Sequence, residues 1–399
     1  MKKILLLGGS SQQIVAIETA KKMGYFTVLC DYLEDNPGQY HSDSFYLVST
    51  TDKEAILKVA KKEKIDGILA YASDPAAPTA AYVSEKLGFN SNPYKSVEIL
   101  CNKDLFRSFL DENGFNSPRA EGYFTVSDAK KDITNFKLPI IIKPVDSSGS
   151  KGATVLYKLD KLDRALNFAF SFSRSKRIVI EEFIKKKHNY LIGGDIFVDN
   201  GEVILWGLMN CHRDSKVNTL VPVGKSYPLK LEEEDIIEVK KTLQRMVNKL
   251  GLKSGAINVE LIVDKNNCVW PIDVGPRNGG NMIPDLLGMI FNIDIVEISI
   301  KAAMGINFSV SIEEKNNLYY ATYNVHSSKE GFFKEIKYSK EIEPFIIKKC
   351  IYNKAGDKVE YFDNASKAIG IIFFKFINES DMNYYMKNID NFIDIVLEE

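Results

Sequence analysis

The chain has 399 residues, enough for about two to four structural units with ample core. Its hydrophobic content of 45% and charged content of 26% are ordinary for a globular protein, and its net charge of −1 gives no footprint for nucleic acid. The five cysteines form no CxxC pair, and no run approaches the ~20 apolar residues that a membrane span needs. We therefore expect a soluble cytoplasmic protein without nucleic-acid or membrane partners.

The first 95 residues alternate between short apolar strands and amphipathic helices. Strands are expected at 3–7, 26–30 and 66–71, and helices at 12–23, 53–63 and 78–87. This order is typical of a doubly wound sheet, whose ligands bind beyond the carboxyl ends of the strands. The loops Ser10–Gln12 and Ser73–Asp74 lie at that edge, although turn and helix-cap chemistry also explains them. Gly8-Gly9-Ser10 is not the full GxGxxG fingerprint, so dinucleotide binding has weak support.

Two lysines and a flexible loop stand out in the next part of the chain. A helix is expected at 96–113, where Lys103 alone would pass as a surface lysine. Lys143 ends an apolar strand at 138–144, and a buried lysine is costly unless it meets negative charge. The Gly/Ser-rich loop Asp146–Gly152 offers N–H groups and hydroxyls to phosphate oxygens. Such a small, flexible loop can also close over a ligand as a lid. It lacks Walker A spacing, so it is not a Walker A loop.

An acidic strand end follows, together with several further helices. The strand at 177–180 runs into Glu181-Glu182-Phe183-Ile184, where carboxylates can accept hydrogen bonds from an adenine amine or a ribose hydroxyl. Two acids at a strand end are more often simply solvated. Further helices are expected at 161–172, 233–250, 294–304 and 382–397.

The segment 256–281 predicts a hairpin with an acidic face. If its turn is centred on 266–267, ladder partners have residue numbers that sum to 533, so Glu260 faces Asp273 and Asn258 faces Gly275. Facing carboxylates repel by up to ~1 kcal/mol unless a cation lies between them. Mg²⁺ suits this position, because it takes oxygen ligands and usually shares them with nucleotide phosphates. A solvated acidic face is the alternative.

Arg277 strengthens the interpretation as a phosphate-handling site. It lies four residues after Asp273, in a turn that contains Pro276, Gly279 and Gly280. A guanidinium, a cation site and open backbone N–H groups together are suited to phosphate chemistry.

In this order and spacing, the motifs resemble the ATP-grasp superfamily, which includes biotin carboxylase, glycinamide ribonucleotide synthetase, D-alanine–D-alanine ligase and amino-acid ligases. The resemblance covers about residues 1–305. It implies an α/β and α+β multidomain fold with a Rossmann-like pre-ATP-grasp domain at 1–95 and an ATP-grasp domain at 96–305. A mobile lid is expected at about 120–184, and a C-terminal α+β segment at 306–399 would complete the substrate pocket.

The resemblance also implies a role for each motif residue. ATP would be the cosubstrate and Mg²⁺ the metal, with Mn²⁺ as an alternative. The phosphates would contact Lys103, Lys143, Ser148 and Gly149, and adenine would contact Glu181, Glu182, Phe183 and Ile184. The ribose would lie near His188 or a neighbour. Glu260 and Asp273 would bind the metal, and Arg277 would stabilise the transferred phosphoryl or the acyl phosphate.

The chain departs from the family pattern at two positions. The second metal carboxylate is usually glutamate, and here it is Asp273. An asparagine is usual two residues later, and here Gly275 has no side chain to offer. A second Mg²⁺ is therefore in question, or part of its shell falls to Asn278 or water. The sequence identifies no general base, and His326 and Asp74 are only guesses.

Family members commonly activate a carboxylate as an acyl phosphate, which an amine then attacks. We therefore expect an ATP-dependent ligase that joins a small-molecule carboxylate to an amine and releases ADP and phosphate. An amino acid or amino sugar is a candidate substrate, because the GPRNGGN variant loosely resembles ligases found beside surface-polysaccharide genes. The alternatives are an enzyme that activates bicarbonate as carboxyphosphate and a non-catalytic nucleotide-binding protein. The oligomeric state is left open, a homodimer included.

Overall fold

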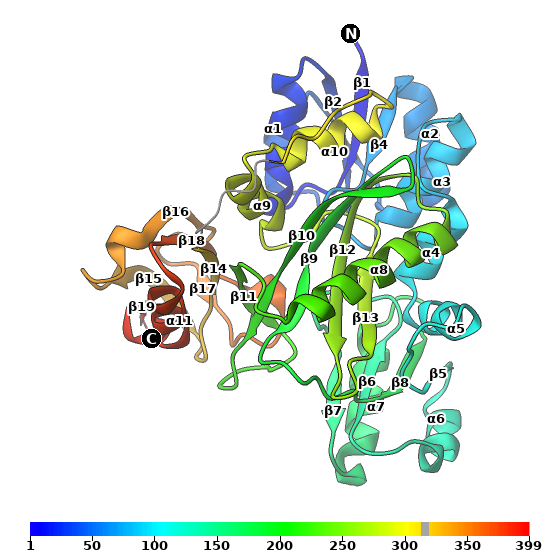
Figure 1. Ribbon diagram of the computed structural model, residues 1–399. Coiled ribbons are helices and arrows are strands. Elements are labelled where there is room, and N and C mark those ends of the chain that lie inside the picture. Colours follow the sequence, from blue (N-terminus) through cyan, green and yellow to red (C-terminus); the bar gives the residue numbers. More distant parts are fainter. Residues whose placement is uncertain (313–318, 399) are drawn as a thin grey trace.

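Four β-sheets and their covering helices build the molecule in the computed structural model (Figure 1), which describes residues 1–312 and 319–398. Residues 313–318 and 399 of the predicted C-terminal segment lie outside these ranges. The sheets hold four, eight, three and four strands within the described residues. No helix in the described ranges is long and apolar enough to cross a membrane. The mixed α/β multidomain fold expected from the sequence is confirmed.

The N-terminal sheet is parallel, as its alternating strands and helices predicted. Its spatial order is β3 (Ser44–Leu47), β2 (Phe26–Asp31), β1 (Lys3–Leu7) and β4 (Gly67–Leu69). The helices around it are α1 (Ile14–Lys22), α2 (Lys53–Glu63) and α3 (Ala77–Leu87). The sequence did not predict β3, because this short edge strand is only partly buried and lacks the continuous apolar run of its neighbours.

The eight-stranded sheet forms the centre of the molecule. Its order is β13 (Val269–Gly275), β12 (Ser254–Val263), β9 (Leu191–Asp199), β10 (Glu202–Arg213), β11 (Pro222–Tyr227), β14 (Tyr319–Val325), β18 (Gly370–Phe376) and β16 (Ile346–Ile351). Helix α8 (Glu233–Leu250) covers one face, and α9 (Ile283–Phe291) and α10 (Ile295–Ala303) cover part of the other. The uncovered part of that second face carries the candidate site.

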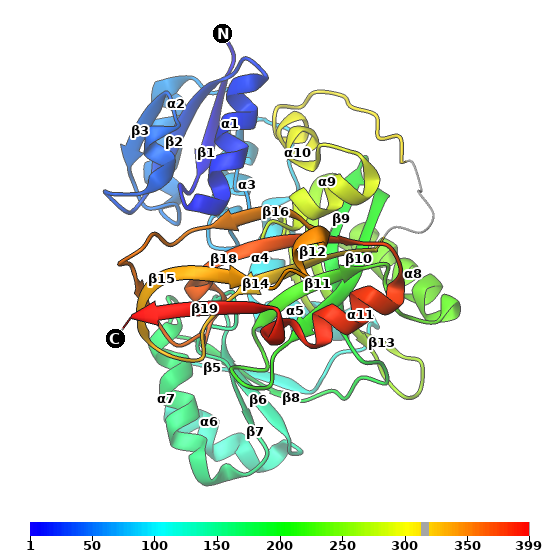
Figure 2. The ribbon, with the colours of Figure 1, turned by 90° about the vertical axis from the view of Figure 1, so that its left-hand side faces the viewer.

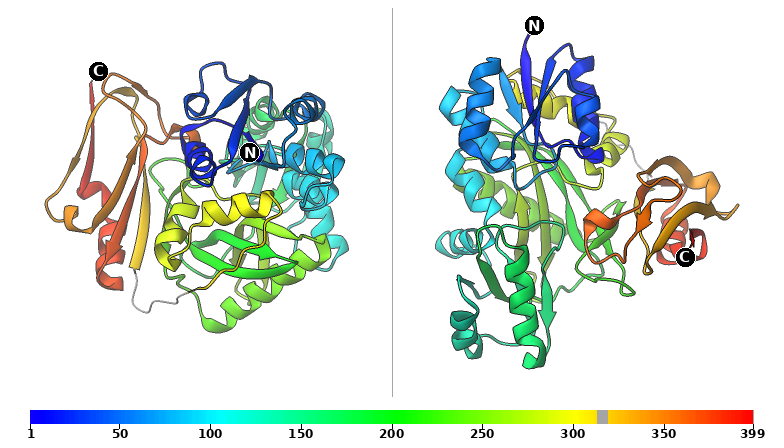
Figure 3. Two further views of the ribbon diagram at one scale, coloured as in Figure 1. Left: turned by 90° about the horizontal axis from the view of Figure 1, so that it is seen from above. Right: turned by 180° about the vertical axis from the view of Figure 1, so that it is seen from behind.

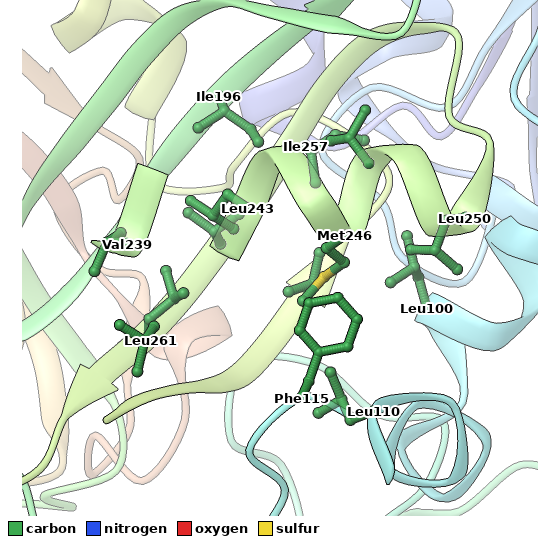
Figure 4. Packing of buried hydrophobic residues seen from close by; sticks show 14 of the residues in the cluster. Leu100, Leu110, Phe115, Ile196, Val239, Leu243, Met246, Leu250, Ile257 and Leu261 are labelled. Atoms are coloured by element: carbon green, nitrogen blue, oxygen red, sulfur yellow. The ribbon is translucent and has the colours of Figure 1, made fainter. Parts of the chain in front are cut away.

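Helix α8 is placed by an apolar stripe at helical spacing. Val239, Leu243, Met246 and Leu250 recur every three or four residues and lie against Ile196, Ile257 and Leu261 of β9 and β12 (Figure 4). Successive strand residues point to opposite faces, so this packing directs Asp195, Asn258 and Glu260 away from α8. The core beneath α8 therefore fixes the orientation of the acidic face.

A smaller antiparallel sheet, called the lid sheet below because it falls in the predicted lid range, lies at the lower end of the molecule in Figure 1. Its order is β5 (Ala120–Tyr123), β8 (Ile178–Glu182), β6 (Ile140–Pro144) and β7 (Thr154–Leu156), and it is covered by α6 (Val126–Asp132) and α7 (Leu162–Phe172). The unit has its own apolar core. Its strands lie within the range at which the sequence predicted a lid, and the limits and mobility of that lid stay predictions.

The C-terminal strands β14, β18 and β16 extend the large sheet beyond β11 (Figure 2). The others, β15 (Gly331–Tyr338), β17 (Lys358–Val359) and β19 (Ile393–Glu398), form the three-stranded sheet beside α11 (Glu379–Lys387). Figure 3 shows this part set to one side of the N-terminal and lid sheets. The predicted closing helix at 382–397 is wrong, because its second half is β19, whose β-branched residues pair with β15.

The predicted helix at 96–113 is also wrong, because it is two helices, α4 (Tyr94–Cys101) and α5 (Lys103–Glu112). The residue between them, Asn102, has extended backbone angles. The N–H of Lys103 then donates to the carbonyl of Val145, 3.0 Å away, instead of continuing α4. A domain limit between residues 95 and 96 falls within α4, and the domain limits stay predictions.

Candidate functional site

A cavity of about 470 Å³ lies between the lid sheet and the large sheet. Ten of the sequence-predicted residues line it: Lys103, Lys143, Ser148, Gly149, Glu181, Glu182, Phe183, Ile184, Glu260 and Asp273. They come from elements far apart in the chain, so only the tertiary structure brings them together. His188 and Arg277 are the two predicted residues that do not line this cavity.

Lys143 and Glu181 form a buried charge cluster with Arg107. The Nζ of Lys143 lies 2.9 Å from Glu181 Oε2, and the Nε of Arg107 lies 3.0 Å from Oε1. All three residues are buried. Desolvation alone raises the pKa of Glu181, but Arg107 and Lys143 outweigh it and hold that pKa below its usual value. Desolvation also lowers the pKa of Lys143, against the attraction of Glu181.

Glu181 supplies the negative charge that Lys143, as a buried lysine, was expected to need. The cluster also engages both carboxylate oxygens of Glu181. A carboxylate has further acceptor capacity, so a contact between Glu181 and adenine stays a prediction. The direct effect of Glu181 in the structure is to hold Lys143 in the cavity wall.

The hairpin of β12 and β13 carries the acidic face in the predicted pairing. Glu260 lies opposite Asp273 and Asn258 opposite Gly275, but the register shifts after Glu260, where Leu261 faces Pro271. The prediction that all ladder partners have residue numbers summing to 533 is therefore wrong beyond Glu260. The extra residue on β13 forms a bulge beside a proline, which has no N–H to donate.

Arg107 binds the carbonyls that the bulge leaves free. Its Nη1 lies 3.3 Å from the carbonyl oxygen of Pro271, and its Nη2 lies 2.6 Å from that of Ile272. The same guanidinium thus contacts Glu181 of the lid sheet and the backbone just before Asp273. An arginine on the apolar face of α5, between Phe106 and Leu110, was the sequence signal for this role.

Cations already surround the two facing carboxylates. Arg213 Nη2 lies 3.1 Å from Glu260 Oε1, and Lys103 Nζ lies 3.8 Å from Asp273 Oδ2. Desolvation raises the pKa of Asp273, but Lys103 and then Lys143 outweigh it and keep that pKa below its usual value. Asp273 is therefore available as a charged oxygen ligand.

The donor set fits a metal that is shared with a nucleotide. No cluster of three or more His, Cys, Asp or Glu residues that could hold a metal occurs in the described part of the chain. Two carboxylates cannot by themselves supply all the ligands that a metal ion needs. Mg²⁺ characteristically binds through one or two carboxylates and takes its remaining ligands from water and phosphates. Glu260 and Asp273, which line the cavity, suit that mode.

The Gly/Ser-rich loop closes one side of the cavity. Lys103 Nζ donates to the carbonyl of Ser147 at 2.8 Å, and Ser150 Oγ donates to the carbonyl of Leu220 at 2.9 Å. Gly149 has a φ of +65°, a conformation that favours glycine. The N–H of Ala365 also donates to the carbonyl of Gly149 at 3.4 Å, and the mobility of this loop stays a prediction.

A second cavity, of about 380 Å³, lies next to the first. Loops of the N-terminal sheet, the Gly/Ser-rich loop, the hairpin and the turn at Ala365–Ser366 line it. Glu260 and Asp273 line both cavities. A ligand in the second cavity would therefore meet a nucleotide in the first at these two carboxylates.

Lys225 is a cationic residue in the second cavity that the sequence did not single out. It is only 5% exposed, and its Nζ contacts Cys211 Sγ. A Cβ on Gly193 would lie 2.9 Å from that Nζ, so the ammonium extends over Gly193, the ladder partner of Glu260. No carboxylate of the described residues forms an ion pair with Lys225. No sequence signal marked it, because β11 was not predicted.

Arg277 lines the second cavity and is bound by Asp74. Its Nε lies 2.7 Å from Asp74 Oδ1, and its Nη2 lies 2.5 Å from Oδ2. Both carboxylate oxygens of Asp74 therefore accept hydrogen bonds from Arg277, which makes Asp74 a poor general base. His326 contacts Asp214 and the carbonyl of Asn324 and lines neither cavity, so it is no better candidate.

His188 lies outside the lining of the first cavity. Its Nε2 accepts a hydrogen bond of 2.9 Å from the N–H of Val263, which fixes the end of β12. Its neighbours Lys186, Asn189 and Tyr190 do line the cavity. A ribose contact through one of these neighbours, the alternative left open from the sequence, stays a prediction.

Comparison with known proteins places this geometry in a family. Residues 102–311 match the family described as carbamoyl-phosphate synthase L chain, ATP binding domain. The formate-dependent phosphoribosylglycinamide formyltransferase of Sulfurisphaera tokodaii is 25% identical over 311 residues, covering 76% of this chain and 77% of the relative. The carbamoyl phosphate synthase large chain of Clostridium botulinum is 23% identical over 76% of this chain, but the match covers only 27% of that relative.

Solved structures show the same fold at low sequence identity. The L-amino acid ligase from Bacillus licheniformis aligns with a TM-score of 0.83 and 19% identity, covering 100% of this chain and 99% of that one. Phosphoribosylglycinamide synthetase from Anaerococcus prevotii aligns with a TM-score of 0.77 and 22% identity over 100% of both chains. The family match spans more than half of the chain, and the protein therefore belongs to the ATP-grasp family of ATP- and Mg²⁺-dependent, ADP-forming carbon–nitrogen ligases.

Proposed function

We propose that this enzyme joins a small carboxylate to an amine through an acyl phosphate. The observation that carries the proposal is the pair of cavities that meet at Glu260 and Asp273, with the buried ammonium of Lys225, which forms no ion pair with a carboxylate of the described residues, in the second. A buried cation without a carboxylate partner is costly, and an anionic substrate would neutralise it. The second cavity is therefore the proposed site for the acid.

In the proposed reaction, Lys103 and Lys143 bind the nucleotide phosphates, and Glu260 and Asp273 hold Mg²⁺. The metal supplies charge neutralisation on phosphate oxygens. A carboxylate oxygen of the acid bonds to the γ-phosphorus as the bond to the bridging oxygen of ADP breaks, with Arg277 beside the phosphoryl group. The amine nitrogen then bonds to the acyl carbon, phosphate leaves, and the nitrogen loses a proton.

The Gly/Ser-rich loop protects the intermediate in this proposal. Its residues Ser148 and Gly149 line both cavities, so closure would cover the nucleotide and the acid together. An acyl phosphate hydrolyses if water reaches it, and a closed loop excludes that water. The fold shared with an L-amino acid ligase supports an amino acid as one substrate. An amino sugar stays the second candidate.

Bicarbonate activation is less well supported by the second cavity. Its volume of about 380 Å³ leaves room for an acid larger than bicarbonate. Carbamoyl phosphate synthases among the relatives keep bicarbonate on the panel of acids to be tested.

The test is a hydroxylamine trap, because hydroxylamine converts acyl phosphates to hydroxamates whatever the natural amine is. ADP release and hydroxamate formation are measured over a panel of amino acids, other carboxylic acids and bicarbonate. We expect at least one acid to stimulate both, and ¹⁸O from the labelled carboxylate to appear in phosphate. Release of AMP and pyrophosphate, or ADP release with bicarbonate alone, would overturn the proposal.

A further inference from the structure

Gly275 provides space that any side chain would fill. A Cβ on this residue would lie 2.7 Å from Asp74 Oδ1 and 3.2 Å from Arg277 Cζ. Its φ is outside the positive range, so an alanine could adopt the same backbone. The need for glycine in strand β13 is therefore steric, and the two groups that require the space are those of one ion pair.

That ion pair connects two separate sheets. Asp74 follows β4 of the N-terminal sheet, whereas Arg277 follows β13 of the large sheet. The side chains are mostly buried, at 22% and 13% exposure, and make two hydrogen bonds in parallel. Arg277 Nη1 also donates to the carbonyl of Asn278 at 3.0 Å. These contacts use three of the five N–H donors of the guanidinium, which leaves two for a ligand in the second cavity.

Other carboxylates would attract Arg277 if Asp74 were absent. After Asp74, the negative charges that act most strongly on Arg277 are those of Asp195 and Asp273, and Asp273 lines the second cavity together with Arg277. Asp195 already accepts hydrogen bonds from the N–H of Gly279 and from Asn258, so it has its own partners. Asp273 is the carboxylate proposed to hold Mg²⁺, and an arginine that moved towards it would compete with the metal.

We infer that Asp74 is a positioning residue that holds Arg277 in the second cavity and away from Asp273. In this inference, glycine at position 275 leaves room for the ion pair of Asp74 and Arg277. The inference rests on the proposed role of Arg277 in phosphoryl transfer. It accounts for the departure from the family pattern at residue 275, because an asparagine there would displace the carboxylate of Asp74.

A double-mutant cycle with Gly275→Ala and Asp74→Ala tests the inference. Hydroxamate formation is measured with the best acid found for the wild type, at varied acid and Mg²⁺ concentrations. We expect Gly275→Ala to lower kcat/KM about tenfold or more in the wild-type background and less than about twofold in the Asp74→Ala background. The three atoms nearest to the added methyl group belong to this ion pair, and Asp74 Oδ1 is the closest at 2.7 Å, so most of the cost should disappear when Asp74 is removed.

Asp74→Ala should also raise the Mg²⁺ concentration for half-maximal rate several-fold, which a purely structural role would not do. The matched control is Asp35→Ala, an exposed carboxylate of the same sheet unit that contacts Tyr40. Equal costs of Gly275→Ala in both backgrounds, or an unchanged Mg²⁺ requirement, would overturn the inference. If a single variant unfolds, Asp74→Asn keeps the side-chain shape, and the same Mg²⁺ titration decides.

Arg277→Met separates the two proposals. If this variant keeps near-normal turnover, the proposed role of Arg277 fails, whatever Asp74 does. If Arg277→Met loses turnover while the cycle shows no coupling between Asp74 and Gly275, the proposed function stands and only the positioning role fails.

Discussion

Replacing Arg107 by methionine should destabilise the protein more than any surface substitution. The side chain is 4% exposed, so methionine would fill much of its volume without opening a large cavity. The change removes both contacts to Glu181 and the hydrogen bonds to the carbonyls of Pro271 and Ile272. Lys143 would then be the remaining cation for a buried carboxylate.

The magnitude follows from the groups left behind. Breaking a buried charge pair by removing one partner costs about 3–5 kcal/mol. Each of the two carbonyls left without its donor adds about 1–3 kcal/mol, and because these neighbouring groups relax together we expect a total near the lower end of the sum, about 5–6 kcal/mol. That is a large fraction of the ~5–15 kcal/mol by which proteins are stable. Arg107→Lys keeps the charge but loses the fork of donors, so its cost should be about half as large.

Urea unfolding followed by circular dichroism measures this loss, and calorimetric titration with Mg-ATP measures its consequence in the cavity. Glu181 should draw Lys143 towards itself in Arg107→Met, so nucleotide affinity should fall at least tenfold in the fraction that stays folded. Arg164→Met, on the exposed surface of α7, is the matched control and should change neither quantity. A loss within 1 kcal/mol of that control would refute the account of the cluster.

Three further outcomes are expected. Glu260→Gln and Asp273→Asn should each lower turnover by ~10²-fold with a change in stability under ~1 kcal/mol, measured by ADP release and thermal unfolding; near-normal turnover of both would leave the hairpin as only an acidic face. Proteolysis should nick the chain near Lys151, and Mg-ATP should protect it; equal cleavage with and without nucleotide would contradict the lid. Because the pKa of Glu181 is lowered in the folded protein, its carboxylate stabilises the fold at pH values above the ordinary carboxyl pKa of 4.5. This stabilisation should be lost as the pH falls below 4.5 towards the lowered pKa. Urea unfolding between pH 5 and 3 should therefore show a smaller loss of unfolding free energy in Arg107→Met than in the wild type.

Local patterns were sufficient for much of the fold and for the identity of the motif residues. Helices 53–63 and 233–250 were predicted with their observed ends, because each has an apolar stripe at helical spacing and a clear boundary. The pairing of Glu260 with Asp273 also followed from the sequence, because alternation in a hairpin depends on neighbouring residues alone.

Features that depend on distant partners were decided by the tertiary structure. The bulge beside Pro271 needed Arg107 from α5 to satisfy its carbonyls, and no local pattern shows a contact across 164 residues. The break before Lys103 depended on the carbonyl of Val145, and the strand at the chain's end depended on β15 as a pairing partner. Local propensity cannot outweigh such contacts, because burial and hydrogen bonding at long range contribute more free energy than a helix propensity.

The same distinction holds within the site. The residue types at Lys143 and Arg277 already indicated phosphate chemistry, and that of Glu181 indicated a contact with adenine or ribose, since this chemistry is carried by each side chain itself. Whether each group is free or bound depends on its neighbours in space: Asp74 binds Arg277, and Lys225 has no carboxylate partner among the described residues. Gly275 read as a missing ligand in the sequence, and the structure shows it as the space that the Asp74–Arg277 ion pair occupies, because only packing reveals which atoms a side chain would meet.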